Sequence, residues 1–158
     1  MKKQQGGFTM IELIMVIVIL GILAAFALPR FADFGTDAQV ATMKGALGSV
    51  KSASGIAHAQ ALLKAPADSK IKLEGIEITM IGTYPTATKT GIGAAAQLSE
   101  QDFSITDATG TSGAGTFEVA AKGKAACKFT YTIAAAGTDG VQAAPTYNAE
   151  GLTVANCK

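Results

Sequence analysis

The hydrophobic residues of this chain are concentrated in one run near its N-terminus. Every side chain in residues 13–28 is apolar, and the wider span 8–28 contains a single charge, Glu12. As a helix that rises about 1.5 Å per residue, this span is roughly 30 Å long, which matches the hydrocarbon thickness of a bilayer. The pattern therefore predicts a membrane-spanning helix over residues 8–28.

The charges around this helix predict its orientation. Lys2 and Lys3 precede it, so the positive-inside rule places its N-terminal end in the cytoplasm and the bulk of the chain on the far side. Glu12 is costly, because a charge near the bilayer core is unfavourable by about 2.5–3.5 kcal/mol on insertion scales. We therefore expect this carboxylate to have a partner.

The helical pattern continues beyond the apolar run and becomes amphipathic. Apolar side chains recur at approximately helical spacing as far as residue 63, with charged residues between them. The predicted core-facing stripe comprises Phe31, Phe34, Ala38, Ala41, Leu47, Val50, Ile56, Leu62 and Leu63. We predict one long helix over residues 8–63, ended by Pro66, whose second half covers a sheet.

The remainder of the chain has the short segments typical of β structure. Residues 116–120 and 128–133 alternate cleanly between apolar and polar, as half-buried strands do. The other predicted strands are 103–105, 152–154 and a strand within 71–78 that is bulged at Gly75. Residues 82–85 and 138–140 predict turns. The predicted fold class is α+β, a long N-terminal helix packed on a small antiparallel sheet.

Three interpretations of the N-terminus are open from the residues. A cleaved secretory signal suits the basic start and the small residues 25–27, but Glu12 and Pro29 do not fit it. A permanent single-span anchor is the second. The third rests on residues 6–12, GGFTMIE, followed by the long apolar run, which resemble the leader and first helix of type IV pilins and of the pseudopilins of type II secretion. Met10 stands where that family often has leucine.

The resemblance covers residues 6–30 and implies a processing site. In type IV pilins a membrane peptidase cuts after the glycine that matches Gly7, and the new N-terminal residue, here Phe8, is N-methylated. The family's glutamate falls on Glu12. Its helix glycine and proline fall on Gly21 and Pro29. Proline predicts a kink or break there, either an ordinary kink in a continuous helix or, as the resemblance implies, a weak point that melts in the filament. The implied domains are a leader at 1–7, a transmembrane and filament-core helix at 8–28 and a globular region at 29–158.

Cleavage before Phe8 would supply the partner that Glu12 needs. The exposed α-amino group carries substantial positive charge at neutral pH. If the Phe8 amine of one subunit meets Glu12 of a neighbour, two costly charges compensate each other. We therefore predict that this pair sets the axial register of the subunits.

The chain has two cysteines, Cys127 and Cys157, in the region expected outside the cytoplasm. A disulfide between them is predicted. Metal binding is a weak alternative, because the one histidine, His58, is distant in sequence. In type IV pilins a similar cysteine pair bounds a C-terminal loop that faces neighbouring subunits, whereas major pseudopilins usually lack it. The pair therefore favours a pilin over a pseudopilin.

Composition and motifs argue against an enzyme or a nucleic-acid-binding protein. The net charge is +1, and no basic patch with interleaved aromatic residues is present. His58 lies among small residues of the helix, and no nucleophile motif, phosphate-binding loop or paired-cysteine metal motif occurs. Acidic loop residues do not match the spacing of a calcium loop. We therefore predict no cofactor, metal or catalytic residue.

A shorter resemblance covers the middle of the chain. Residues 84–88, YPTAT, followed by Gly91 and Ile92, are similar to a segment of the mannose-sensitive haemagglutinin pilins of marine bacteria. The resemblances imply the structural subunit of a type IVa pilus for adhesion or motility. Such a subunit is a homo-oligomer that depends on a prepilin peptidase and inner-membrane assembly machinery, and it moves from the inner membrane to the cell surface. The alternatives are a pseudopilin of a type II secretion system and a secreted binding or enzymatic domain.

Overall fold

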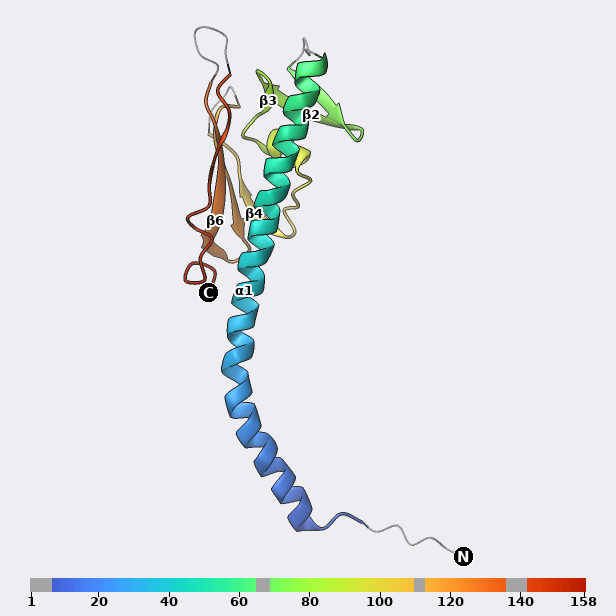
Figure 1. Ribbon diagram of the computed structural model, residues 1–158, viewed down its shortest axis with the longest axis vertical. Coiled ribbons are helices and arrows are strands. Elements are labelled where there is room, and N and C mark those ends of the chain that lie inside the picture. Colours follow the sequence, from blue (N-terminus) through green and yellow to red (C-terminus); the bar gives the residue numbers. More distant parts are fainter. Residues whose placement is uncertain (1–6, 65–68, 110–112, 136–141) are drawn as a thin grey trace, which may run out of the picture. The chain divides into compact units, whose positions relative to one another are not determined.

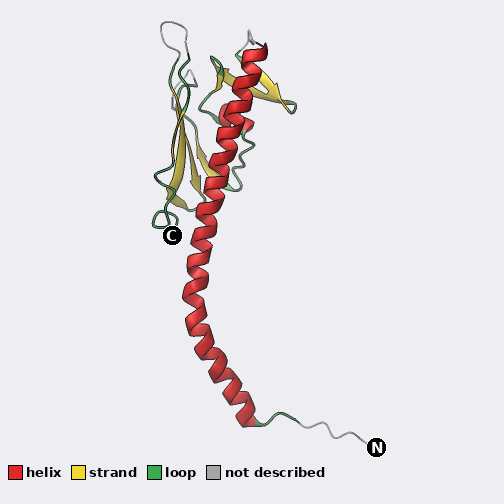
Figure 2. Cartoon of the chain, in the orientation of Figure 1, coloured by secondary structure: helices red, strands yellow, loops and turns green. Residues whose placement is uncertain are grey.

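The computed structural model describes residues 7–64, 69–109, 113–135 and 142–158, with the side chains of residues 29–33 excepted (Figures 1 and 2). The chain divides into two compact units, Met1–Asp37 and Ala38–Lys158, and we call the second the head domain. Three predicted features lie outside the described residues: residues 1–6 of the predicted leader, the end of the helix at Pro66 and the turn at 138–140.

The first element is the long helix α1 (Met10–Lys64), which confirms the predicted helix. Within the head domain its buried side chains recur every three or four residues, at some turns as adjacent pairs, and lie on one face. They include Val40, Met43, Leu47, Val50, Ala57 and Ala61. This face packs against two small antiparallel sheets, so the predicted α+β class is also confirmed.

The predicted core-facing stripe of this helix is largely wrong. Leu47 and Val50 are buried, but the other members whose side chains are described are exposed, with Leu63 at 87% and Phe34 at 72%. Those exposed members are Phe34, Ala38, Ala41, Ile56, Leu62 and Leu63. The helix is rich in alanine and apolar on more than one face, so its periodicity alone does not identify which face meets the sheets. The side chain of Phe31 lies outside the described residues.

The larger sheet has four strands in the order β4 (Phe103–Thr106), β5 (Gly115–Ala121), β6 (Lys124–Ile133) and β7 (Thr146–Asn148). All neighbouring pairs are antiparallel. Its buried face includes Phe117, Val119, Phe129 and Tyr131, which join Val50 and other α1 side chains in one apolar cluster. The predicted strands at 103–105, 116–120 and 128–133 are confirmed.

The predicted last strand is wrong in position. Residues 152–154 belong to no strand, and Leu152 contributes a buried side chain to the core without pairing in a sheet. The last strand is instead β7, which pairs with β6 through Tyr131 and Tyr147. β7 forms because it pairs with the edge of the ten-residue strand β6. The residues of β7 themselves do not indicate this pairing, so it could not be predicted from them.

The smaller sheet has three strands in the order β1 (Lys70–Leu73), β2 (Ile76–Ile81) and β3 (Tyr84–Pro85). The predicted bulged strand over 71–78 is wrong, because β1 and β2 form a hairpin. Its turn residues Glu74 and Gly75 both have positive φ, 49° and 86°, as a tight hairpin turn requires. The predicted turn at 82–85 is correct only for its first half, since residues 84 and 85 pair with β2.

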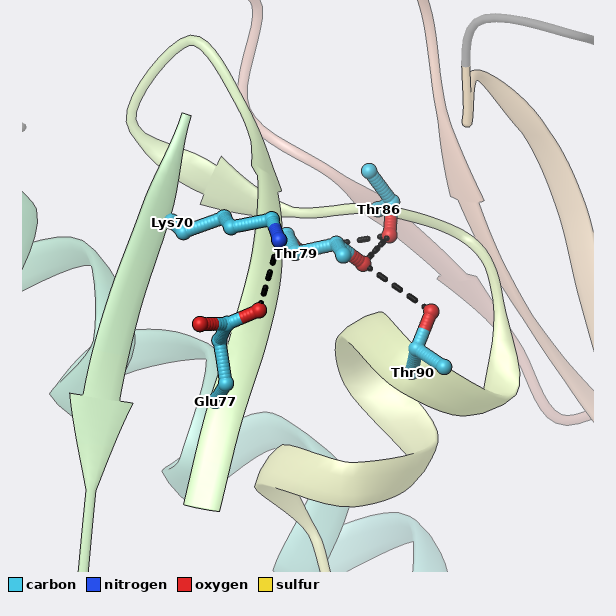
Figure 3. Close-up of polar contacts among 5 residues, drawn as sticks. All are labelled: Lys70, Glu77, Thr79, Thr86 and Thr90. Atoms are coloured by element: carbon cyan, nitrogen blue, oxygen red, sulfur yellow. Dashed lines mark hydrogen bonds and ion pairs between the residues drawn. The ribbon is translucent and has the colours of Figure 1, made fainter. Parts of the chain in front are cut away.

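Four threonine hydroxyls connect β2 to the short helical turn η1 (Lys89–Gly93), and Figure 3 shows three of them. Thr79 Oγ1 lies 2.7 Å from Thr86 Oγ1 and 3.2 Å from Thr90 Oγ1. Thr88 Oγ1 lies 2.8 Å from Thr86 Oγ1 and 3.3 Å from Thr90 Oγ1. The hydroxyls therefore form a closed ring, which we call the threonine ring, and each can donate one hydrogen bond and accept another.

Candidate functional site

The first candidate site is the surface of the N-terminal part of α1, Met10–Leu28, which we call the rod. Among the described residues it is the helix that is long and apolar enough to cross a membrane. Its large side chains are all exposed, from 50% for Val16 to 77% for Phe26. Such a continuous apolar surface far exceeds the scattered exposed residues of ordinary soluble domains. The rod therefore requires lipid or protein neighbours.

Glu12 lies in the first turn of α1 and is hydrogen-bonded to Thr9, the residue that precedes the helix. The Thr9 backbone N–H and hydroxyl both donate to Glu12 Oε2, at 2.9 and 2.7 Å. In return the Glu12 N–H donates to Thr9 Oγ1 at 3.3 Å. This reciprocal pattern is a capping box, which satisfies helix N–H groups that otherwise have no partner.

The sequence analysis did not identify Thr9 as a functional residue. A signal was available, because Thr9-Met10-Ile11-Glu12 has the Thr-x-x-Glu spacing of a capping box before an apolar run. Within the described chain Glu12 Oε1 receives no hydrogen bond. The same carboxylate can therefore cap its own helix and still accept a charged donor from elsewhere.

The residues of the predicted processing site, Gly7 and Phe8, lie before the helix begins. Both are exposed, and the Phe8 side chain is 90% accessible to solvent. Exposed, non-helical backbone is the conformation in which peptidases can reach a bond. Cleavage after Gly7 and methylation of Phe8 stay predictions.

Gly21 and Pro29 both lie inside α1, which is helical on either side of each residue. Proline lacks the backbone N–H that an interior helical position would donate, and glycine costs about 1 kcal/mol relative to alanine. The predicted break at these positions concerns the assembled filament and stays a prediction.

Cys127 and Cys157 form a disulfide in the head domain, and their Cα atoms are 4.7 Å apart. Both cysteines are fully buried in the main core. The Lys124 ammonium donates a 2.7 Å hydrogen bond to the Cys157 carbonyl oxygen. The disulfide and this hydrogen bond therefore hold the C-terminus against β6.

All three tyrosines of the chain contact a neighbouring aromatic ring in the head domain. The His58 ring stacks on Tyr84 with centroids 4.1 Å apart, and its Nδ1 lies 3.1 Å from the Thr83 carbonyl oxygen. Tyr131 and Tyr147 meet edge to face at 5.6 Å. His58 is thus held by packing and by a backbone contact. The described residues contain no group of three or more histidine, cysteine or acidic side chains that could hold a metal ion.

Tyr131 is the most deeply buried of these tyrosines. Its hydroxyl donates a 2.8 Å hydrogen bond to the Pro85 carbonyl oxygen, which links β6 to β3. Burial raises the pKa of the Tyr131 hydroxyl well above its usual value, because the phenolate would lose its hydration. The same effect raises the pKa of the half-buried Tyr147.

Comparisons with known proteins give one family match, which includes the rod, and several similar proteins. Residues 2–28 match the family of the prokaryotic N-terminal methylation motif. The chain is 51% identical over 55 residues to the type IV narrow pilus major component PilA5 of Thermus thermophilus, which covers 35% of this chain and 47% of the relative. It is 38% identical over 91 residues to a fimbrial protein of Pseudomonas aeruginosa, which covers 58% of this chain and 49% of the relative.

A third relative is the type IV major fimbrial protein FimA of Dichelobacter nodosus, 42% identical over 53 residues, or 34% of each chain. The matched region thus spans between a third and a half of the length of these three relatives. No solved structure is significantly similar to this chain. Residues 2–28 therefore carry a prokaryotic N-terminal methylation motif, and the chain is similar in part to proteins named as type IV pilus and fimbrial components.

Proposed function

We propose that this chain is the repeating structural subunit of a type IV pilus that serves attachment or motility. One observation carries the proposal: the rod exposes large apolar side chains along its whole length and carries a single carboxylate at its start. The rod lies within the matched N-terminal methylation motif, and relatives named as major pilus or fimbrial components match about a third of this chain. A filament of identical subunits is the arrangement that gives every rod the same apolar neighbours.

The physical mechanism is an exchange of apolar neighbours. Before assembly the rod lies in the inner membrane, where lipid covers its side chains. During assembly the rods of other subunits replace the lipid, so apolar surface stays out of water throughout. A prepilin peptidase first removes the leader after Gly7, and inner-membrane machinery then extracts each subunit into the filament.

Glu12 would give this nonspecific packing a defined axial step. Its Oε2 is held by Thr9, and its Oε1 is available to the Phe8 amine of a neighbouring subunit. A subunit that stopped out of register would leave a carboxylate and an ammonium unpaired in apolar surroundings, which costs several kcal/mol. The capping box orients the carboxylate before the neighbour arrives.

The test is electron microscopy of surface filaments together with peptide mapping of the mature N-terminus. We expect long fibres composed of this chain that begin at a methylated Phe8. Short or absent fibres with the same mature N-terminus would support a pseudopilin of a secretion system instead. A mature chain that begins at or beyond Leu28 would reject the proposal in favour of ordinary secretion.

Two variants of Glu12 separate its charge from its capping role. Glutamine can replace glutamate in a capping box, so Glu12→Gln preserves the cap but removes the charge. Glu12→Ala removes both. If charge pairing sets the register, both variants lose filaments to a similar extent. Normal filaments with Glu12→Gln would show that capping alone is required.

A further inference from the structure

The larger sheet of the head domain has a polar hollow on the face that is turned away from the apolar core. The hollow has a volume of about 300 Å³ and lies over β4, β5 and the turn that leads into β6. This volume is at the lower end of the range for small-molecule sites. Its polar lining consists of Ser104, Thr106, Glu118 and Lys124, and the rest is alanine and glycine.

The hollow forms where the ladder between β5 and β6 is irregular. Ala120 pairs with Lys128, whereas the next residue, Ala121, pairs with Lys124, so residues 125–127 of β6 have no partner on β5. A bulge of this kind bends its strand and interrupts the ladder. The lining residues Ala120 and Ala125 carry only methyl groups. The space that the bulge creates is therefore left open.

Two hydroxyls from β4 form one wall of the hollow. Ser104 lies opposite Ala120 and Thr106 lies opposite Glu118 in the pairing of β4 with β5, and both side chains of β4 are exposed. Within the part of the chain that the structure describes, neither hydroxyl forms a hydrogen bond to another protein group. A hydroxyl both donates and accepts, so this wall suits a ligand that is rich in hydroxyl groups.

The charged groups of the hollow leave it with an excess of positive charge. The Lys128 ammonium donates a 2.7 Å hydrogen bond to Glu118 Oε2, which balances that carboxylate and leaves its Oε1 as an acceptor. The Lys124 ammonium uses one of its three N–H groups on the uncharged Cys157 carbonyl oxygen. Among the described residues no carboxylate forms an ion pair with Lys124.

We propose that this hollow binds a saccharide unit that carries a carboxylate, such as the uronic acids of acidic polysaccharides. The carboxylate of the sugar lies at Lys124, and its hydroxyls bond to Ser104, Thr106 and Glu118 Oε1. The alanine methyl groups contact the C–H groups of the sugar ring. The inference goes beyond the proposed function, because the hollow lies within one copy of the chain and requires no assembly.

The donors and acceptors of the hollow favour this ligand over two simpler ones. A neutral sugar would leave the Lys124 ammonium without an opposite charge. A fully ionised phosphate, free or in a lipid headgroup, would satisfy Lys124 but has no proton to donate to Glu118 Oε1. A sugar acid supplies both a carboxylate and hydroxyl donors, and a carboxylate on an ammonium forms one of the stronger kinds of hydrogen bond.

Titration of the full-length chain in a non-ionic detergent tests the ligand class. Isothermal titration calorimetry would compare trigalacturonate with the neutral trisaccharide maltotriose and with inorganic phosphate. We expect trigalacturonate to bind about 10-fold more tightly than maltotriose, because of the charge-assisted contact with Lys124. Equal affinity for the two trisaccharides, or tighter binding of phosphate than of trigalacturonate, would overturn the proposal.

Two pairs of variants locate the site. Lys124→Met keeps the side-chain stem but removes the charge, so the preference for trigalacturonate should fall about 10-fold while maltotriose binding is unchanged. Lys122→Met is the matched control, because Lys122 belongs to the same turn but does not line the hollow. Ala125→Leu fills the hollow and should weaken trigalacturonate binding about 10-fold, whereas Ala149→Leu, at an exposed alanine elsewhere, should not. Equal effects within either pair would reject this site.

A filament would amplify a weak single site. The described lining includes no aromatic ring, so each site depends on hydrogen bonds and one charge. Many copies on one filament bind a polymer more tightly than one copy does, because each further contact is intramolecular. We expect pelleted filaments to retain polygalacturonate at least about 100-fold more tightly than the detergent-solubilised subunit binds trigalacturonate. Failure of the chain to form filaments would reject the proposed function, and the titration of the subunit would still test the hollow.

Discussion

The rod and the head-domain part of α1 belong to one helix but bury different kinds of residue. The rod consists of large apolar side chains, and all of those in it are exposed within the chain. In the head domain, the buried side chains of α1 include several alanines, while Ile56, Leu62 and Leu63 are exposed. In this helix, exposed large side chains require neighbours outside the chain, whereas the buried small side chains pack within it.

The disulfide should contribute strongly to the stability of the head domain, whereas the side chains of the rod should not. Replacing both cysteines, Cys127→Ser with Cys157→Ser, removes a cross-link between residues 30 apart in sequence. We expect a loss of about 3–4 kcal/mol in the free energy of unfolding, because the unfolded chain gains freedom. Denaturant unfolding of the full-length chain in detergent, under oxidising conditions, measures it.

The matched control for this variant is Ile17→Ala in the rod, which should leave the unfolding of the head domain unchanged. The Ile17 side chain is 57% exposed and is not a member of either buried core cluster. A similar loss of head-domain stability from Ile17→Ala would show that the two regions are not energetically separate.

The two faces of α1 in the head domain should respond very differently to truncation. Met43 is 1% exposed, and Met43→Ala should cost about 3 kcal/mol through lost contacts and a residual cavity. Ile56→Ala removes a similar amount of side chain from an exposed position and should change stability by less than about 0.5 kcal/mol. Thermal unfolding of the two variants checks this contrast. Equal losses would mean that Ile56 is buried within one copy.

The threonine ring should contribute to the stability of the head domain. Thr86 is only 6% exposed, and its hydroxyl lies within hydrogen-bond distance of Thr79 and Thr88. Thr86→Val keeps the shape of the side chain but removes one of the two ring partners of Thr79 and of Thr88, which should cost about 2 kcal/mol for the two lost hydrogen bonds. Chemical denaturation measures the loss. Thr116→Val, on an exposed strand position, is the control and should be nearly neutral.

Alkaline pH should destabilise the head domain through Tyr131. The pKa of its hydroxyl is raised in the folded state, so the unfolded chain releases this proton first as pH increases. Stability from this group is therefore complete below about pH 10, the pKa of an unperturbed tyrosine, and falls above it. We expect a loss of about 1.4 kcal/mol between pH 9 and pH 11.

Tyr131→Phe serves as the control for the pH experiment. It removes the hydrogen bond to the Pro85 carbonyl oxygen, so it should lower stability at neutral pH by about 1 kcal/mol. It should also flatten the stability profile above pH 10. An unchanged alkaline slope in this variant would assign the effect to another group, with Tyr147 the first candidate because burial also raises its pKa.

The hairpin and the final strand show why parts of the head domain could not be predicted. A turn of Glu74 and Gly75 has no asparagine or aspartate before its glycine, so the common hairpin signal is absent. β7 is only three residues long, and its place depends on the edge that β6 offers. Both features depend on pairing partners that are distant in sequence or on backbone geometry that the residue types only weakly favour.

The sequence by itself determined the rod, the methylation motif and the strands with clear alternation, because each depends on residues that are close together in the chain. The capping box of Thr9 and Glu12 is likewise a local feature, since the spacing of these two residues alone specifies it. Only the tertiary structure decided which face of α1 in the head domain is buried and which is exposed. An alanine-rich helix can pack on several faces, and the sheets formed later in the chain select one of them.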